Sequence, residues 1–313
     1  MQIIFDKIIE GVNDRSTLVS ATNETVCDDA RRLFHGRGHC YDQLEFITVD
    51  WFTPVILVSF FKAPEEKWLD GFKRGMAAFN DVEKIKSIIF QYRYLQGAPC
   101  EILKGEVPDT LNAHENGLDF RLAVGKNQNV GFFLDMQNCR QWLKDQAPGK
   151  KILNLFSYTC AFSVVAASSG AKSVVNMDMA KGALSTGKTN HKINDLDTKS
   201  VFFFAHDIFK SWGKIRKYGP YDCIVVDPPS FQRGSFDARK DYIKIVNKLS
   251  ELLTADGLVM ACLNSPELDF AFLRELFAQA GGFQEQEVIP VPDSFPEVDK
   301  DKGLKTVVFQ KIG

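Results

Sequence analysis

The chain has 313 residues and a mass of 35.2 kDa, which is enough for two domains with substantial cores. Hydrophobic residues make up 45% and charged residues 25%, and no apolar run reaches the roughly 18 residues of a membrane span, which argues against disorder and membrane insertion. The net charge of -2 argues against binding nucleic acid by bulk electrostatics. Two local basic clusters are present, and each is either a solvated surface or a phosphate contact. The first is formed by Arg31, Arg32, Arg37, His35 and His39, and the second by Lys210, Lys214, Arg216 and Lys217.

The amino-terminal segment MQIIFDKIIEGVNDR carries acidic residues early and has no basic start, so we expect no secretion signal and a cytoplasmic protein. The seven cysteines are scattered and form no CxxC pair, which favours reduced thiols over disulfides or a zinc site. We therefore expect no metal and no membrane partner. The oligomeric state stays open.

A small α+β domain is expected over residues 1–110, where strand-like runs predominate. The expected elements are strands at 44–51 and 55–61, a helix at 65–79 and a strand at 84–94. Residues 97–116 lack a clear period and contain several turn formers, so they are expected to connect the two domains. A hairpin is expected next, with strands at 118–124 and 129–134, and then a helix at 136–146. The role of the first domain is open, with substrate recognition as one candidate.

Residues 111–313 are expected to form the larger domain, because from Lys150 onward short apolar strands alternate with helical stretches. The expected strands are 151–155, 173–177, 200–205, 222–226, 258–263, 284–289 and 306–311. The last two are joined by a proline-rich loop, 290–303, without a helix, so the final strand is expected to run antiparallel. Seven strands that end in this way are typical of the Rossmann-like, doubly wound sheet of S-adenosylmethionine-dependent methyltransferases.

Polar groups follow the first three strands of this sheet, where such a fold binds its cofactor. Asp178 is placed to accept hydrogen bonds from both ribose hydroxyls, and Asp207 to accept from the adenine amino group. The expected cofactor-binding residues at these strand ends are Asn154, Phe156, Ser157, Tyr158, Thr159, Asp178, Met179, His206, Asp207 and Asp227. The chain has no GxGxxG motif and no Walker loop, which weakens dinucleotide and nucleoside-triphosphate alternatives.

The fourth strand ends in Asp227-Pro228-Pro229-Ser230-Phe231. Because prolines cannot continue a sheet ladder, the backbone must leave the sheet here, at the edge where open α/β folds place their chemistry. Asp227 and a carbonyl of Pro228 or Pro229 can accept hydrogen bonds from an amino group, while Phe231 stacks on a base flipped out of its helix. With Asn264 after the fifth strand, these residues form the expected catalytic set.

Several runs resemble the bacterial large-subunit ribosomal RNA methyltransferases that modify cytosine C5 or guanine N7. They are HGRG at 35–38, GFFLDMQNCR, NLFSYTCAF, VVNMDMAKGAL, HDIF and DPPSF, within a resemblance that covers roughly residues 30–313. An extra RNA-binding domain of the PUA or THUMP type, which several relatives carry at the amino end, is not expected here. The resemblance implies S-adenosylmethionine as cofactor, with Phe133, Asp135 and Arg140 near it and residues 156–159 around its methionine portion.

Whether carbon C5 of cytosine can be methylated depends on a cysteine nucleophile, because cytosine-C5 enzymes activate the ring by adding a cysteine thiolate to it. In the cytosine-modifying relatives this cysteine follows the fifth strand, where the present chain has Asn264. Cys262, two residues earlier, is expected to be a core residue, so C5 methylation is disfavoured. Guanine N7 of ribosomal RNA is favoured, and an exocyclic amine stays open. The alternatives are a methyltransferase of proteins or small molecules, and a non-catalytic protein that binds S-adenosylmethionine.

Overall fold

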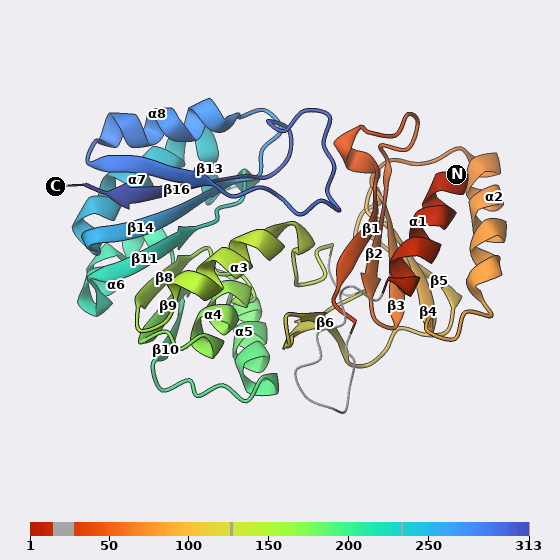
Figure 1. Cartoon of the computed structure of the whole chain (residues 1–313), viewed down its shortest axis with the longest axis horizontal. Coiled ribbons are helices and arrows are strands. Elements are labelled where there is room, and N and C mark those ends of the chain that lie inside the picture. Colours follow the sequence, from red (N-terminus) through yellow and green to blue (C-terminus); the bar gives the residue numbers. More distant parts are fainter. Residues whose placement is uncertain (15–27, 126–127, 233, 313) are drawn as a thin grey trace. The chain divides into compact units, whose positions relative to one another are not determined.

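A computed structural model of the chain describes residues 1–14, 28–125, 128–232 and 234–312. The chain divides into two compact units, the first made of Met1–Leu134 with Asp293–Val298 and the second of Asp135–Pro292 with Asp299–Gly313 (Figure 1). This division differs from the expected boundary after residue 110, because the hairpin that follows groups with the first unit. Within the described ranges, no helix has both the length and the apolar character needed to cross a membrane.

The first unit is a five-stranded sheet with the strand order β1-β2-β3-β4-β5, in which β3 and β4 are parallel and the other neighbours antiparallel. Its elements are α1 (Gln2–Asn13), β1 (Arg31–His35), β2 (Ile47–Phe52), β3 (Val55–Phe60), α2 (Glu66–Met76), β4 (Ser87–Tyr92) and β5 (Cys100–Lys104). Ile8 of α1 and Phe72 of α2 join one buried core with Trp51 of the sheet, so both helices cover the same face. The rings of Phe5 and Phe72 stack at 5.4 Å between centroids.

The hairpin of the first unit differs from the expectation. It pairs β6 (Leu111–Glu115) with β7 (Leu118–Leu122), so the expected connection 97–116 contains two strands, β5 and β6. The expected partner 129–134 forms no strand with it. Asn116 and Gly117 make the turn with φ of 51° and 80°, the left-handed pair that a two-residue hairpin turn requires. The Asn-Gly dipeptide is therefore the signal that places this hairpin.

The HGRG segment packs against residues 293–298, which come from far along the chain but belong to the same unit. A Cβ on Gly38 would lie 1.7 Å from the carbonyl oxygen of Pro296, so only glycine allows this approach. The N–H of Val298 donates to the Gly38 carbonyl at 2.9 Å, and His35 Nε2 lies 3.2 Å from Glu297 Oε1. The segment therefore anchors the loop between the last two strands of the chain.

The second unit contains a seven-stranded sheet in the order β10-β9-β8-β11-β14-β16-β15. Its strands are β8 (Lys151–Leu155), β9 (Ser173–Asp178), β10 (Val201–Ala205), β11 (Tyr221–Val226), β14 (Leu253–Leu263), β15 (Phe283–Val288) and β16 (Lys305–Lys311). The strands from β10 to β14 pair in parallel, and β16 is antiparallel to both β14 and β15. The Rossmann-like fold with an antiparallel last strand is confirmed.

Helices cover both faces of this sheet (Figure 1). They are α3 (Gln137–Gln146), α4 (Ala161–Ser168), α5 (Lys181–Ile193), α6 (Trp212–Tyr218), α7 (Ala238–Leu252) and α8 (Phe270–Ala280). One core lies under α6, α7 and α8 and contains Leu155 and Val226, while the other lies under α3 and α4 and contains Val225 and Cys262. Because β8, β9, β10, β11 and β14 are parallel, their carboxyl ends meet at one edge of the sheet.

Candidate active site

The loop after β8 contains no glycine, yet its backbone adopts left-handed conformations that glycine usually provides. Phe156, Tyr158 and Cys160 have φ of 57°, 46° and 62°, in the left-handed region. Each such residue costs about 1–2 kcal/mol relative to a right-handed conformation, which the surrounding contacts must offset. The N–H of Ser157 donates to the Met177 carbonyl at 3.2 Å, which ties the loop to β9. The missing glycine-rich turn is thus replaced by strained backbone, a feature that marks functional sites.

Asp178 at the end of β9 holds this loop in place. Its Oδ2 accepts from the Tyr158 N–H at 2.8 Å, and its Oδ1 accepts from the Ala180 N–H at 2.7 Å. A carboxylate has about four acceptor positions, so each oxygen can still accept another hydrogen bond. Asp178 therefore has the chemistry to bind a vicinal diol while it shapes the loop that would hold the rest of the ligand.

Asn154 begins a buried polar chain that sequence analysis missed. Its Nδ2 donates to Asn176 Oδ1 at 3.0 Å, and Asn176 Nδ2 donates to Ser163 Oγ at 2.8 Å. Ser163 lies 3.0 Å from His191 Nε2, and His191 Nδ1 donates to the Gly187 carbonyl at 2.7 Å. Burial lowers the pKa of His191, which keeps the ring neutral and leaves Nε2 as acceptor for the serine hydroxyl.

The signal for this chain is Asn176, a polar residue inside an otherwise apolar strand, and it shares a face with Asn154 across the β8–β9 register. Asn154 Oδ1 is buried and has no hydrogen-bond partner among the described residues. An unsatisfied buried acceptor costs about 1–3 kcal/mol, so a bound donor group at this position would stabilise the protein.

Asp227 lies at the end of β11 in a charged environment. Burial, together with the negative charge of Asp135, raises the pKa of Asp227 to about 7, and the positive charge of Arg140 opposes this rise. Arg140 is itself 2% exposed on α3. The structure thus brings together three expected site residues within the second unit. A carboxyl group with a pKa near neutrality can either accept or donate a proton under physiological conditions.

The residues after Asp227 form a short hairpin of β12 (Phe231–Gln232) and β13 (Phe236–Asp237). Pro228 is buried and Pro229 is half-buried, whereas Phe231 is 69% exposed. An exposed aromatic side chain at a sheet edge can stack on a planar base.

Asn264 follows β14 and is exposed. Its carbonyl oxygen accepts a hydrogen bond from Ser230 Oγ, which joins the two loops at the ends of β11 and β14. Below them, the buried Tyr242 hydroxyl donates to the Cys262 carbonyl at 3.1 Å and lies 3.5 Å from the Val226 carbonyl. Sequence analysis missed Tyr242, which connects the strands that carry Asp227 and Asn264.

Cys262 is 0% exposed and lies in the core under α3. Its neighbour Cys139 and its burial raise the pKa of the Cys262 thiol well above the usual value. Such a thiol stays protonated, and nucleophilic attack requires the thiolate. Cys40 and Cys100 are the more accessible thiols of the described residues, and Cys27 lies outside them.

Four further expected cofactor residues lie in capping or exposed positions. Asp207 caps a short 3-10 helix, Ile208–Lys210, by accepting from the Phe209 N–H at 2.9 Å. His206 is exposed beside it, and Met179, directly after Asp178, is 55% exposed. Phe133 is 41% exposed and belongs to the first unit. Within the described ranges, no cluster of three or more metal-binding side chains is present.

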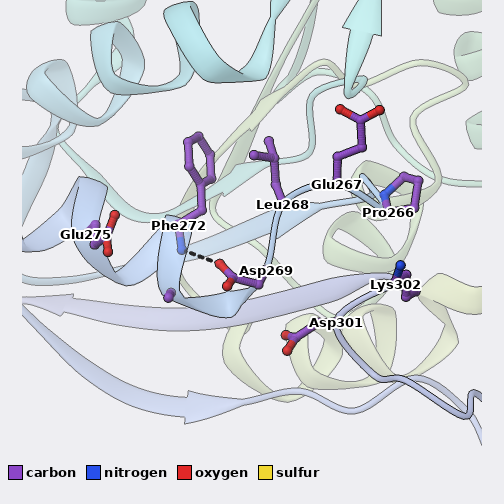
Figure 2. Close-up of a pocket in the computed structure, with 9 residues that line it drawn as sticks. Pro266, Glu267, Leu268, Asp269, Phe272, Glu275, Asp301 and Lys302 are labelled. Atoms are coloured by element: carbon purple, nitrogen blue, oxygen red, sulfur yellow. Dashed lines mark hydrogen bonds between the residues drawn. The ribbon is translucent and has the colours of Figure 1, made fainter.

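A pocket of about 490 Å³ lies beyond Asn264, around the start of α8 (Figure 2). It is lined by Pro266, Glu267, Leu268, Asp269, Ala271, Phe272, Glu275, Asp301 and Lys302. Asp269 caps α8 by accepting from the Phe272 N–H at 2.9 Å. Acidic side chains outnumber the one lysine, and none of the expected site residues lines the pocket. Its charge disfavours phosphate groups.

Comparison with known proteins agrees with this geometry. The family model of S-adenosylmethionine-dependent methyltransferases matches residues 31–310. YwbD of Bacillus subtilis (strain 168), named as a candidate ribosomal RNA large subunit methyltransferase, is 27% identical over 97% of this chain and 79% of its own length. Ribosomal RNA large subunit methyltransferase I of Shewanella denitrificans is 29% identical over 86% of this chain and 72% of its own length.

Among solved structures, SMU.776, a candidate methyltransferase complexed with SAH, has a TM-score of 0.83 and 25% identity, covering 99% of this chain and 79% of that one. The family match covers most of the chain, including every strand of the sheet that carries the candidate site, except the last residue of β16. The chain therefore belongs to the S-adenosylmethionine-dependent methyltransferases and uses S-adenosylmethionine as its methyl donor.

Proposed function

We propose that this methyltransferase transfers a methyl group to a base nitrogen of ribosomal RNA, with guanine N7 as the favoured atom. Two observations support RNA as the substrate: the names of the relatives, and the exposed Phe231 beside a carboxyl group at the edge of the sheet. RNA bases that are splayed out of a helix are bound by such stacking and edge contacts.

The chemistry of the second unit fits the cofactor. Asp178 retains acceptor capacity for the ribose hydroxyls, and the buried Asn154 Oδ1 needs a donor such as an amino group. In this proposal residues 156–159 hold the methionine portion and Asp207 accepts from the adenine amino group. When bound, S-adenosylmethionine supplies an electrophilic methyl group on a positively charged sulfur.

The observation that carries the choice of a nitrogen atom is the position of Cys262. A cytosine C5 is activated by covalent addition of a thiolate, yet this thiol is fully buried and protonated. Asn264, at the position where the cytosine-modifying relatives have their cysteine, is exposed. Its side chain can donate or accept a hydrogen bond at the base edge. A ring nitrogen already has a lone pair, so Asp227, Phe231 and Asn264 need only orient the base and exclude water.

In guanine, the N1–H and N2 amino groups both donate, so the ionised Asp227 carboxylate can hold that edge of the base. The opposite edge then presents N7 for methyl transfer. An exocyclic amine is the second candidate, because it must lose a proton and the pKa of Asp227, about 7, suits a proton acceptor near neutral pH.

Nucleoside mass spectrometry of ribosomal RNA from cells with and without the gene tests this proposal. The purified enzyme is then given the RNA from the deletion cells, with Asp227→Asn as the inactive control. Loss of 7-methylguanosine, restored by the enzyme, supports N7, and loss of an N-methylated amine supports the second candidate. Loss of 5-methylcytidine would contradict the choice of nitrogen, and an unchanged nucleoside profile would contradict RNA as the substrate.

A further inference from the structure

We propose that the face of α6 and α7 is the surface on which the RNA backbone docks, an inference that rests on the proposed RNA substrate. This surface, here called the lysine face, is formed by Lys210, Lys214, Lys217, Lys240, Lys244 and Lys248. The occupant is the sugar-phosphate backbone next to the target nucleotide, and its phosphates provide the complementary charge.

The lysines form two stripes on adjacent elements. Residues 240, 244 and 248 repeat every four positions along α7, so they share one side of the helix over about 12 Å. Residues 214 and 217 are three positions apart on α6 and share one side of it, and Lys210 ends the 3-10 turn that precedes this helix. The two stripes are neighbours, because Lys244 Nζ lies 6.0 Å from the Phe209 ring and Arg216 pairs with Glu251 of α7 at 3.1 Å.

The lysine face begins at the candidate active site. Asp237, which caps α7, is the direct strand partner of Phe231, and Lys240 lies 3.6 Å from its carboxylate. Lys210 lies 3.5 Å from the Asp207 carboxylate. A strand whose base stacks on Phe231 can therefore continue along α7 away from the sheet edge.

Four of the six cations of this face are exposed and available for phosphate, whereas Lys214 and Lys248 are half-buried. The side chains of Lys210, Lys240 and Lys244 are 84%, 78% and 61% exposed, and their carboxylate partners lie within one helical turn. Exposed pairs of this kind contribute about 0–1 kcal/mol, so phosphates can displace them easily. Lys217 is exposed on α6. By contrast, the pocket beyond Asn264 is lined by carboxylates, which directs an anionic strand toward α6 and α7.

The chain offers a matched control that lies on neither α6 nor α7. Lys188 and Lys192 are exposed on α5, and Lys172 is exposed before β9. They are not adjacent in sequence to any residue of the DPPSF hairpin. Replacing three lysines by glutamine at either place changes the net charge equally. A difference in RNA binding between the two variants is therefore due to where the lysines lie and not to the net charge.

The test compares wild type, the lysine-face variant Lys217→Gln, Lys240→Gln, Lys244→Gln, and the control variant Lys172→Gln, Lys188→Gln, Lys192→Gln. Binding of a fluorescein-labelled single-stranded oligoribonucleotide is measured by anisotropy as a function of salt. The slope of the logarithm of the RNA-binding constant against the logarithm of salt concentration reports the number of phosphates neutralised. If each of the three lysines neutralises one phosphate, this slope becomes shallower by about 2 in the lysine-face variant. The affinity at 0.1 M salt then falls on the order of 100-fold. Calorimetry with S-adenosylhomocysteine and thermal melting verify that both variants are folded.

A shallower slope in the lysine-face variant, with the control near wild type, supports the proposal. An unchanged slope, or an equal loss in both variants, overturns the docking surface while wild-type methylation of RNA leaves the proposed function intact. If the wild type neither binds nor methylates RNA, the proposed function fails and the docking surface fails with it.

Discussion

Replacing Asp227 by asparagine should stabilise the protein at alkaline pH while it abolishes methyl transfer. The variant keeps the shape of the side chain but cannot ionise. In the wild type, burial raises the pKa of Asp227 from 3.8 to about 7. The folded chain therefore holds a proton here over a pH range in which the unfolded chain has lost it. The free energy of unfolding consequently falls as the pH rises from about 4 to about 7.

The size of the effect follows from this pKa difference of about 3. Each pKa unit corresponds to about 1.4 kcal/mol, so ionising Asp227 in the folded protein costs up to about 4 kcal/mol at pH 8. The asparagine variant should be more stable than wild type by up to that amount at pH 8, and nearly equal to it at pH 4. The attraction between the carboxylate and the buried Arg140 is already contained in this pKa, which would be higher without it.

Urea unfolding followed by tryptophan fluorescence at several pH values between 4 and 8 measures the difference. Asp256→Asn, at an exposed carboxylate of β14, is the matched control and should behave like wild type. Wild-type kcat/KM should rise about tenfold per pH unit below about 7 if the ionised carboxylate binds the base. Equal stabilities of variant and wild type at pH 4 and pH 8, or full activity of Asp227→Asn, would refute the reasoning.

Three further changes have expected outcomes. Asp178→Ala should weaken cofactor binding by about 1.5–3 kcal/mol, since a charged acceptor is lost, and unchanged affinity by calorimetry would remove it from the cofactor site. Cys262→Ala should retain methyl transfer in a radiolabel assay because the thiol is buried, and an inactive but folded variant would make it the nucleophile. Gly38→Ala should destabilise the protein by more than about 1–3 kcal/mol in urea, because its Cβ would meet the Pro296 carbonyl at 1.7 Å. Gly213→Ala, with open space around the Cβ, is its control, and similar losses in both would contradict this packing.

Much of the second unit follows from local sequence signals. Six of its seven strands lie within one residue of the expected ranges at each end, and β14 begins five residues before its expected start. Most of them are short apolar runs, which periodicity detects, whereas β15 is largely polar. The cofactor class followed from the order of acids at strand ends and from the motif runs, and the family match confirms it. Asp178 is the last residue of β9, Asp227 directly follows β11, and Asp207 lies two residues after the end of β10.

The first unit was harder to predict. Helix α1 and strand β1 were not expected, and the hairpin after residue 110 was given the wrong partner. Strand pairing joins residues distant in sequence, so hydrophobic patterns alone leave the partner open, and only the Asn116-Gly117 turn indicated it. The role of HGRG also depends on a distant segment, residues 293–298, which no local pattern connects to it.

The sequence by itself determined which residues end the strands of the sheet and therefore which chemical groups reach its edge. Only the tertiary structure decided what those groups can do. The Asp227 carboxyl has a pKa of about 7 because burial and Asp135 act on it together. The Cys262 thiol is inert because α3 covers it. Asn154 lies at one end of a buried chain of polar side chains. Periodicity and turn chemistry are local, whereas desolvation and charge interactions sum over neighbours that only folding brings together.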